Sequence, residues 1–278
     1  MRKLHIVDEL IYERAPRLVK SPLWWLAKPV LYRILGYAKA RRMADAVAPL
    51  SGPAALGHVS KLLSLKLDLT GIERLPPTGR CVVVCNHPTG IADGLAVYDA
   101  ILKRRDDAIF FANADALRVN PRFAESLIPV EWVEAKRTRE KARVTLGAAR
   151  AAFEAERCVV IFPAGRLARR NAEGQLVDPP WAATAVSLAQ KYDAPIVPIH
   201  VEGPNSFWFH TFHRFSQELR DITLFHELLN KQGKLFRLTF GHAVDPNGFD
   251  MDTGELCEAL KRHVEVALAT DPDKRFAR

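Results

Sequence analysis

His87 and Asp93 have the residue types and the spacing of a proton-transfer pair. They stand in residues 86–94, Asn-His-Pro-Thr-Gly-Ile-Ala-Asp-Gly, directly after the apolar run at residues 81–85. A short β-branched run followed by a loop with Pro and Gly predicts a buried strand that delivers His87 to a sheet edge. A His that takes a proton, with a carboxylate to orient it, can activate a hydroxyl near neutral pH. The alternative is an ordinary loop His followed by the Asp of an unrelated helix start.

A second motif places three arginines after another apolar run. Residues 158–161 are Cys-Val-Val-Ile, and Phe-Pro-Ala-Gly-Arg-Leu-Ala-Arg-Arg follows at residues 162–170. Gly165 permits close backbone approach, and the guanidinium groups of Arg166, Arg169 and Arg170 can bind phosphate through paired hydrogen bonds. The motif predicts an anion-binding loop at a strand end, although a solvated basic loop has the same composition.

A third motif is the Pro-bounded apolar run at residues 194–201, which ends in Glu-Gly-Pro-Asn-Ser at residues 202–206. Asn205 is a candidate for orienting a partner side chain, whereas turn chemistry alone also accounts for Gly-Pro-Asn. In open α/β sheets, functional sites gather at the carboxyl ends of strands. We therefore expect the ends of these predicted strands to form the site.

The order of the three motifs resembles the glycerolipid/lysophospholipid acyltransferase family, over roughly residues 65–245. The chain is most similar to the hemolysin-like branch, which includes relatives linked to ornithine-lipid synthesis. That branch also shows Asn-Ser after the Pro-bounded strand and a later Glu-Leu-Leu-Asn-Lys, here Asn205-Ser206 and residues 227–231.

The resemblance implies transfer of a fatty acyl group from an acyl-carrier protein or coenzyme A thioester to a lysolipid hydroxyl, without a metal or a tightly bound cofactor. His87 matches the general base of the family, and Asp93 matches the carboxylate that holds its imidazole. The backbone around Thr89–Gly90 or at Gly165 offers candidate donors to the oxyanion. The expected substrate-binding residues are Asn86, Thr89, Gly90, Gly165, Arg166 and Arg169.

The chain departs from the common family pattern at three places. Five residues separate His87 from Asp93 instead of four, which changes the loop but is usual in this branch. Ala164 stands where the common motif has Glu after Phe-Pro, which argues against a glycerol-phosphate acceptor. The Arg-bearing second family motif has no clear match, and Arg118 and Arg122 are weak candidates for it.

Composition limits the partners and the compartment. The net charge of +8 predicts acidic partners such as anionic lipid, and no nucleic-acid motif is present. The four cysteines form no CxxC pair, which predicts buried thiols in a reducing compartment rather than disulfides. No run approaches the roughly 18 uncharged apolar residues of a spanning helix, and the N-terminus lacks the apolar core of a secretory signal.

The first 60 residues differ from the rest. Residues 23–35 mix Trp24, Trp25 and aliphatic residues with spaced cations, and no Asp or Glu occurs between Arg17 and Arg42. This pattern predicts a helix or helix pair in the membrane interface, interrupted at Pro29, on the cytoplasmic side as a peripheral (monotopic) contact with the anionic surface. The alternative is a helical appendage that buries both tryptophans on the protein's own core. We expect a helical region at residues 1–60 and an α/β domain at residues 61–278.

From residue 63 onward, apolar strands alternate with helical segments. This alternation predicts an α/β fold in which helices flank a mixed, largely parallel sheet. The expected strands are residues 67–70, 81–85, 108–112, 127–133, 158–162, 195–201 and 235–240. The expected helices are residues 92–103, 138–156, 181–191 and 253–268.

Two other classes of function compete with an enzyme of this kind. A membrane-surface lipid-binding or scaffold protein that has lost catalysis needs only the N-terminal helices and the basic face. A metal hydrolase would use some of the nine histidines, although no supporting ligand cluster accompanies them. The histidines that suggest it are His200, His210, His213, His226 and His242.

Overall fold

The computed structural model describes residues 4–277, except for 132, 134, 135, 172, 173, 175 and 205–216. Its centre is a seven-stranded sheet in the order β1-β9-β8-β2-β5-β3-β4. Every neighbouring pair is parallel except β8 and β9, which are antiparallel. The predicted mixed, largely parallel sheet is therefore confirmed. The strands are β1 (Lys66–Thr70), β2 (Cys81–Cys85), β3 (Ile109–Asn113), β4 (Leu127–Val130), β5 (Cys158–Ile161), β8 (Ile196–Glu202) and β9 (Leu235–Phe240).

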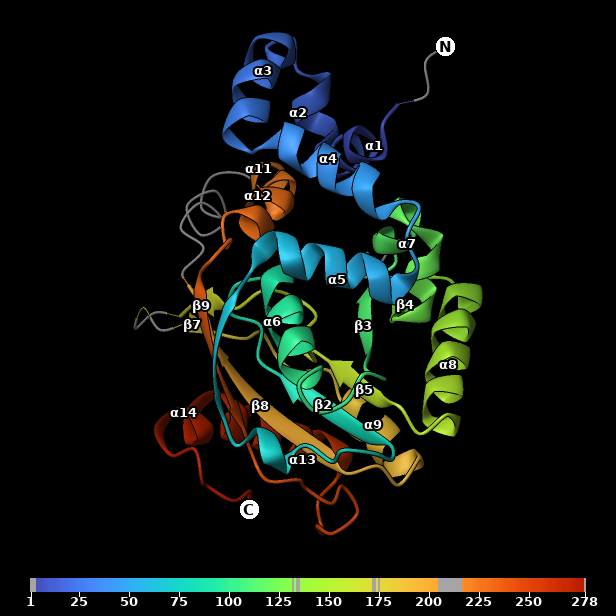
Figure 1. Ribbon diagram of the computed structural model, residues 1–278, viewed down its shortest axis with the longest axis vertical. Coiled ribbons are helices and arrows are strands. Elements are labelled where there is room, and N and C mark those ends of the chain that lie inside the picture. The colour runs from blue at the N-terminus through green and yellow to red at the C-terminus, as the bar shows by residue number, and fades with distance from the viewer. Residues whose placement is uncertain are drawn as a thin grey trace.

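Helices cover both faces of this sheet (Figure 1). On one face, Val83 of β2 joins a core with helices α5, α6 and α12, and on the other, Val82 and Val84 join a core with α8, α9 and α13. Because every residue of β2 is buried, its continuous apolar sequence is that of a central strand covered on both sides. These helices are α5 (Gly52–Leu63), α6 (Ile91–Ile101), α8 (Arg139–Glu154), α9 (Thr184–Lys191), α12 (Leu224–Leu229) and α13 (Thr253–Arg262).

Short elements connect these layers. Strands β6 and β7 form a small antiparallel pair that the sequence patterns did not predict. The helix expected over residues 181–191 begins only at Thr184, and the strand expected over residues 127–133 ends at Val130. The connecting elements are η1 (Ile72–Arg74), α7 (Asp115–Val119), η2 (Pro121–Glu125), β6 (Arg169–Arg170), β7 (Leu176–Val177), α11 (Gln217–Ile222), the π-helical turn η4 (His263–Ala267) and α14 (Leu268–Thr270).

A cluster of helices stands at the N-terminal end of the molecule, at the top of Figure 1. Trp24 is 3% exposed and packs with Tyr12 and Tyr32, whereas the neighbouring Trp25 is 79% exposed. The helix that holds both tryptophans continues through Pro29, so the interruption expected there is wrong. The carbonyl that Pro29 leaves without a helical donor belongs to the exposed Trp25. These helices are α1 (Ile6–Arg14), α2 (Pro16–Lys20), α3 (Trp24–Ile34) and α4 (Tyr37–Val47).

Candidate active site

The His87 and Asp93 side chains meet at the carboxyl end of β2. Nδ1 of His87 lies 2.9 Å from Oδ2 of Asp93, which stands in the first turn of α6. The carboxylate is fully buried, whereas the imidazole is 19% exposed. A carboxylate at Nδ1 favours the tautomer with its proton on that nitrogen, which leaves Nε2 to accept a proton. The pair thus has the geometry of an oriented base.

The loop between the two residues fixes the carboxylate. The backbone N–H groups of Thr89 and Gly90 donate to Oδ2 of Asp93 over 2.9 and 3.0 Å, and the Thr89 hydroxyl donates to Oδ1. Gly90 has φ +111°, and a Cβ there would lie 3.3 Å from a methyl group of Leu167. Only glycine adopts this conformation readily. The loop sequence therefore determines the position of Asp93, and through it the orientation of His87.

Asn86 ties the end of β2 to β8. Its side-chain amide donates to the carbonyl of Val201 over 3.0 Å and accepts from the Val201 N–H over 2.7 Å. Two residues later, a Cβ on Gly203 would lie 2.7 Å from both Thr89 and the Phe236 ring, so the chain approaches the His87 loop closely. Asn86 thus braces the loop from inside the fold. Asn205 and Ser206 of the third motif, like His210 and His213, lie outside the described residues.

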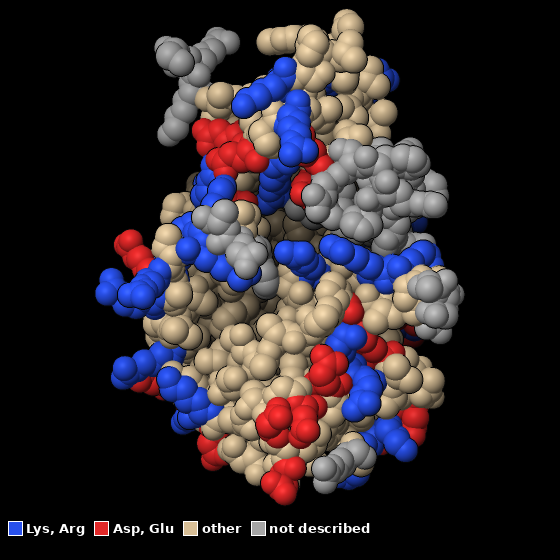
Figure 2. Space-filling view, turned by 180° about the vertical axis from the view of Figure 1, so that it is seen from behind, with Lys and Arg blue, Asp and Glu red and all other residues tan. Residues whose placement is uncertain are grey.

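The arginine motif after β5 contacts the His87 loop directly. The Ala168 N–H donates to the His87 carbonyl over 2.9 Å, and the Phe162 ring lies 4.6 Å from the imidazole, centroid to centroid. Arg166 and Arg169 are exposed, and within the described part of the chain Arg166 makes no ion pair. The fold therefore brings the first two sequence motifs together at neighbouring strand ends. Figure 2, the view from behind Figure 1, shows a hollow below the N-terminal helices with a row of Lys and Arg side chains at that level.

The backbone donors considered for an oxyanion are already engaged. The N–H groups of Thr89 and Gly90 donate to Asp93, and the Gly165 N–H donates to the Phe162 carbonyl over 3.0 Å. Gly165 has φ +60° in this tight turn. The expectation that these three groups face a developing oxyanion is therefore wrong for this arrangement, because each N–H has one proton to donate.

Asp178 supports the dyad from a part of the chain that the motifs did not indicate. Its carboxylate accepts the His87 backbone N–H at 3.0 and 3.2 Å and the Trp181 indole N–H at 3.0 Å. The Asp178 N–H donates to Glu265, which pairs with Lys261 at 2.9 Å. Burial raises the pKa of Asp178 to about 6, although hydrogen bonds from Trp181 and His87 oppose that rise. No spacing signal marks Asp178, which lies in a loop 91 residues from His87.

Asp178 should make the stability of the chain depend on pH in an unusual direction. Its folded pKa lies above the unfolded value, so the group favours the folded state increasingly as pH falls from 7.5 to 4.5. Asp178→Asn removes this titration. The free energy of unfolding of the variant minus that of the native chain should therefore be about 2 kcal/mol higher at pH 7.5 than at pH 4.5. Urea unfolding of both proteins at the two pH values measures this. A difference that does not change with pH would contradict a buried, titrating carboxylate.

The two weak candidates for the missing arginine motif bind carboxylates elsewhere. Arg118 donates to Glu13 over 2.8 and 3.0 Å and joins α7 to α1, and Arg122 donates to Glu125 over 2.8 Å. Neither guanidinium group is directed at the dyad by these contacts. Among the described residues, no three His, Cys, Asp or Glu side chains gather as a metal site requires. None of the described helices has the length and hydropathy needed to cross a bilayer.

The chain is similar to several known acyltransferases. The family model described as Acyltransferase matches residues 58–266. A lyso-glycine lipid O-acyltransferase of Phocaeicola vulgatus is 29% identical over 196 residues, which are 68% of this chain and 68% of that protein. A second lyso-glycine lipid O-acyltransferase, from Bacteroides thetaiotaomicron, is 26% identical over 68% of this chain and 70% of that one. The crystal structure of the 1-acyl-sn-glycerophosphate acyltransferase PlsC from Thermotoga maritima aligns over 98% of this chain and 99% of that chain, with a TM-score of 0.48 and 15% identity.

Proposed function

The chain belongs to the acyltransferase family whose model matches it, and on this basis we propose that it moves a fatty acyl group from a thioester to the hydroxyl of a lysolipid. Membership confirms the family expected from the order of the motifs. The observation that carries the proposal is the 2.9 Å contact between a partly exposed imidazole and a buried carboxylate. A serine or cysteine nucleophile is not required if the acceptor attacks directly.

The proposed reaction uses His87 as a base and then as an acid. Nε2 takes the proton of the acceptor hydroxyl while the hydroxyl oxygen attacks the thioester carbonyl carbon. The new C–O bond gives a tetrahedral intermediate. The C–S bond then breaks, and the imidazolium returns the proton to the leaving thiolate. Asp93 stabilises the imidazolium between these steps. The products are an O-acyl lipid and the free thiol of the donor.

Arg166 and Arg169 are proposed to bind the anionic part of a substrate. Both are exposed, Arg166 on the loop that contacts His87 and Arg169 at the start of β6 directly after it. Guanidinium groups bind carboxylates and phosphates through paired hydrogen bonds. The two curated relatives are named as enzymes of lyso-glycine lipid. We therefore place a lyso-aminolipid first among the acceptors. Ala164, which replaces the Glu of the common motif, is consistent with an acceptor other than glycerol phosphate.

A donor and acceptor screen tests the proposed function. The purified chain is incubated with labelled acyl-carrier protein or acyl-coenzyme A and with detergent-dispersed lyso-glycine lipid, lyso-ornithine lipid or lysophospholipids. Label that enters one lysolipid identifies the donor and the acceptor together. Absence of transfer across all combinations would favour a membrane-surface binding or scaffold protein with the same fold.

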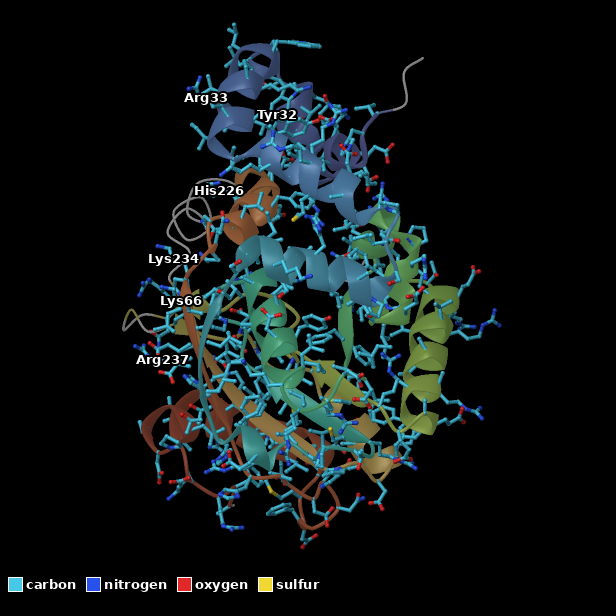
Figure 3. The ribbon with its side chains drawn as sticks, viewed as in Figure 1. Tyr32, Arg33, Lys66, His226, Lys234 and Arg237 are labelled. Atoms are coloured by element: carbon cyan, nitrogen blue, oxygen red, sulfur yellow. The ribbon has the colours of Figure 1, made fainter. Side chains whose placement is uncertain are left out.

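The exposed face of α3 supports a peripheral position at the cytoplasmic membrane surface. The large apolar side chains that face solvent here are those of the N-cap residue Leu23 and, within the helix, Trp25, Leu26, Val30 and Ile34. Leu26, Val30 and Ile34 recur every four residues and therefore share one side of the helix. In Figure 3, Tyr32 points into the helical cluster, whereas Arg33 points away from it. An apolar ridge with cations beside it suits the boundary between headgroups and acyl chains.

Trimming the exposed apolar side chains of α3 should release the chain from vesicles. Trp25→Ser with Leu26→Ser deletes two of the most exposed apolar side chains, at 79% and 76%. Transfer of each side chain from water to an apolar phase is favourable by about 1.5–3 kcal/mol. The bound fraction in liposome flotation should therefore fall at least tenfold. Val144→Ser with Leu146→Ser on α8 is the matched control, because both side chains are more than half exposed. Equal loss in the two double variants would contradict a specific role for α3.

A further inference from the structure

A cavity of about 350 Å³ lies between α4, α5 and the end of α12, away from the reaction loops. Residues three and four apart share one side of a helix, so Lys39, Arg42, Met43 and Ala46 of α4 form a single wall. In Figure 1 this region lies in the upper half of the molecule, where α4 and α12 stand above α5. The other lining residues are His58, Leu62 and Leu63 of α5, and Leu229 and Gln232.

The lining combines an apolar wall with side chains that can carry positive charge. Met43 and Leu63 are buried, while Lys39 and Arg42 are exposed and His58 is half-buried. Among the described residues that line the cavity there is no Asp or Glu. Within the described ranges, Lys39, Arg42 and His58 take part in no ion pair, whereas the adjacent Arg41 lies 4.0 Å from Asp45. The positive charge is thus available to a ligand.

Arg237, on another basic part of the surface, is neutralised by neighbouring carboxylates. Figure 3 shows Lys66, Lys234 and Arg237 along the β1–β9 edge of the sheet. Arg237 there pairs with Glu202 at 3.1 Å and lies 3.6 Å from Asp68. The cavity differs from this edge because its cations border a buried apolar wall and, unlike Arg237, have no carboxylate partner among the described residues.

We propose that the cavity binds an anionic amphiphile, with its phosphate or carboxylate held by Lys39, Arg42 and His58 and its first chain carbons against Met43 and Leu62. Charge complementarity selects the anion, since Arg and Lys bind such groups with charge-assisted hydrogen bonds. The volume lies within the range of small-molecule sites. One wall of the cavity is α4, which packs on α3, the helix with the exposed apolar ridge. Anionic lipid at the membrane surface is therefore its expected source of ligand.

This cavity is distinct from the site of the proposed reaction. None of its lining residues belongs to the loops after β2 or β5. Two of its helices, α5 and α12, pack against α6, the helix that begins beside Asp93. A ligand in the cavity would thus contact the catalytic domain without meeting His87. Binding here is expected to be independent of turnover.

Methyl NMR with soluble probes tests the proposal without a bilayer. The chain has three methionines, so ¹³C-methyl labelling gives a simple spectrum in which Met43 reports on the cavity and Met251 serves as an internal reference. The probes are dihexanoyl phosphatidate below its micelle concentration, dihexanoyl phosphatidylcholine and inorganic phosphate. Phosphatidate should shift the Met43 signal, and both other probes should bind at least tenfold more weakly.

Variants separate this site from the rest of the surface. Lys39→Gln with Arg42→Gln should weaken phosphatidate binding tenfold or more, whereas Lys66→Gln with Lys234→Gln, two exposed lysines at the β1–β9 edge, should not. His87→Ala should bind as the native chain does, even if the proposed acyl transfer fails. Unshifted Met43, equal binding of phosphatidylcholine, or unchanged affinity in the α4 variant would each overturn the proposal. Inorganic phosphate binding as tightly as phosphatidate would overturn the assignment to a lipid.

Discussion

Replacing His87 with Ala is expected to lower kcat for acyl transfer by about 100- to 10,000-fold, the usual contribution of a positioned general base. The imidazole is the exposed member of the dyad, and its Nε2 is the atom left free by the contact with Asp93. A lysolipid hydroxyl is too weak an acid to attack a thioester without losing its proton in the transition state. Single-turnover transfer from the donor identified in the screen measures the loss.

The fold should survive this substitution. The His87 backbone makes its contacts with Asp178 and Ala168 through N–H and carbonyl groups that Ala retains. A native far-ultraviolet spectrum and cooperative thermal unfolding would establish that. His226→Ala on α12 (Figure 3) is the matched control, and it should keep full activity. Native-like transfer by His87→Ala would show that His87 is not the general base and that a residue elsewhere in the chain takes the proton.

The central part of the site could be predicted because its signal is local. Residues 81–85 are apolar throughout and form a strand buried on both faces, and the next nine residues contain both members of the dyad. Short spacing in a turn that leads into a helix restricts where the second side chain can lie. The sheet class followed in the same way, from strands that alternate with helices.

The supports of the site could not be predicted, because they depend on contacts between distant segments. Asp178 binds the backbone of His87 from 91 residues away, and Asn86 binds Val201 from 115 residues away. Hydrogen bonds to backbone groups require no particular partner residue type, so no motif records them. The engaged N–H groups of Thr89 and Gly90 illustrate the same limit, since sequence shows that a donor exists but not where it points.

The N-terminal helices show why adjacent residues can have opposite environments. Consecutive residues on a helix differ by about 100° in direction, so Trp24 and Trp25 cannot both face one neighbour. The sequence pattern predicts one environment for both tryptophans, either buried or in contact with lipid, whereas Trp24 packs inside the cluster and Trp25 faces out. The helix continues through Pro29, and Trp25, whose carbonyl loses its helical donor there, is an exposed residue.

Asp93→Asn is expected to lower kcat by about 10- to 150-fold, the value of a hydrogen bond to a charged group, while the fold survives. The carbonyl oxygen of Asn can occupy the place of Oδ2 and accept from Thr89, Gly90 and His87 Nδ1. Its NH₂ group then faces the Thr89 hydroxyl, which can accept a hydrogen bond instead of donating one. The imidazole keeps its orientation, but the negative charge that stabilises the imidazolium is lost.

Kinetics of this variant separate charge from orientation. Loss of charge alone should reduce kcat with KM unchanged, because the imidazolium forms only as the acceptor proton moves. Asp99→Asn, at the far end of the same helix α6, controls for removing a partly buried carboxylate. A fully active Asp93→Asn would mean that Asp93 serves only to fix the loop and the helix start. A variant that unfolds readily would instead place the main role of Asp93 in the hydrogen bonds that hold the loop. Thr89→Val, which keeps the carboxylate and removes the hydroxyl contact to Oδ1, would then measure what that contact contributes to kcat.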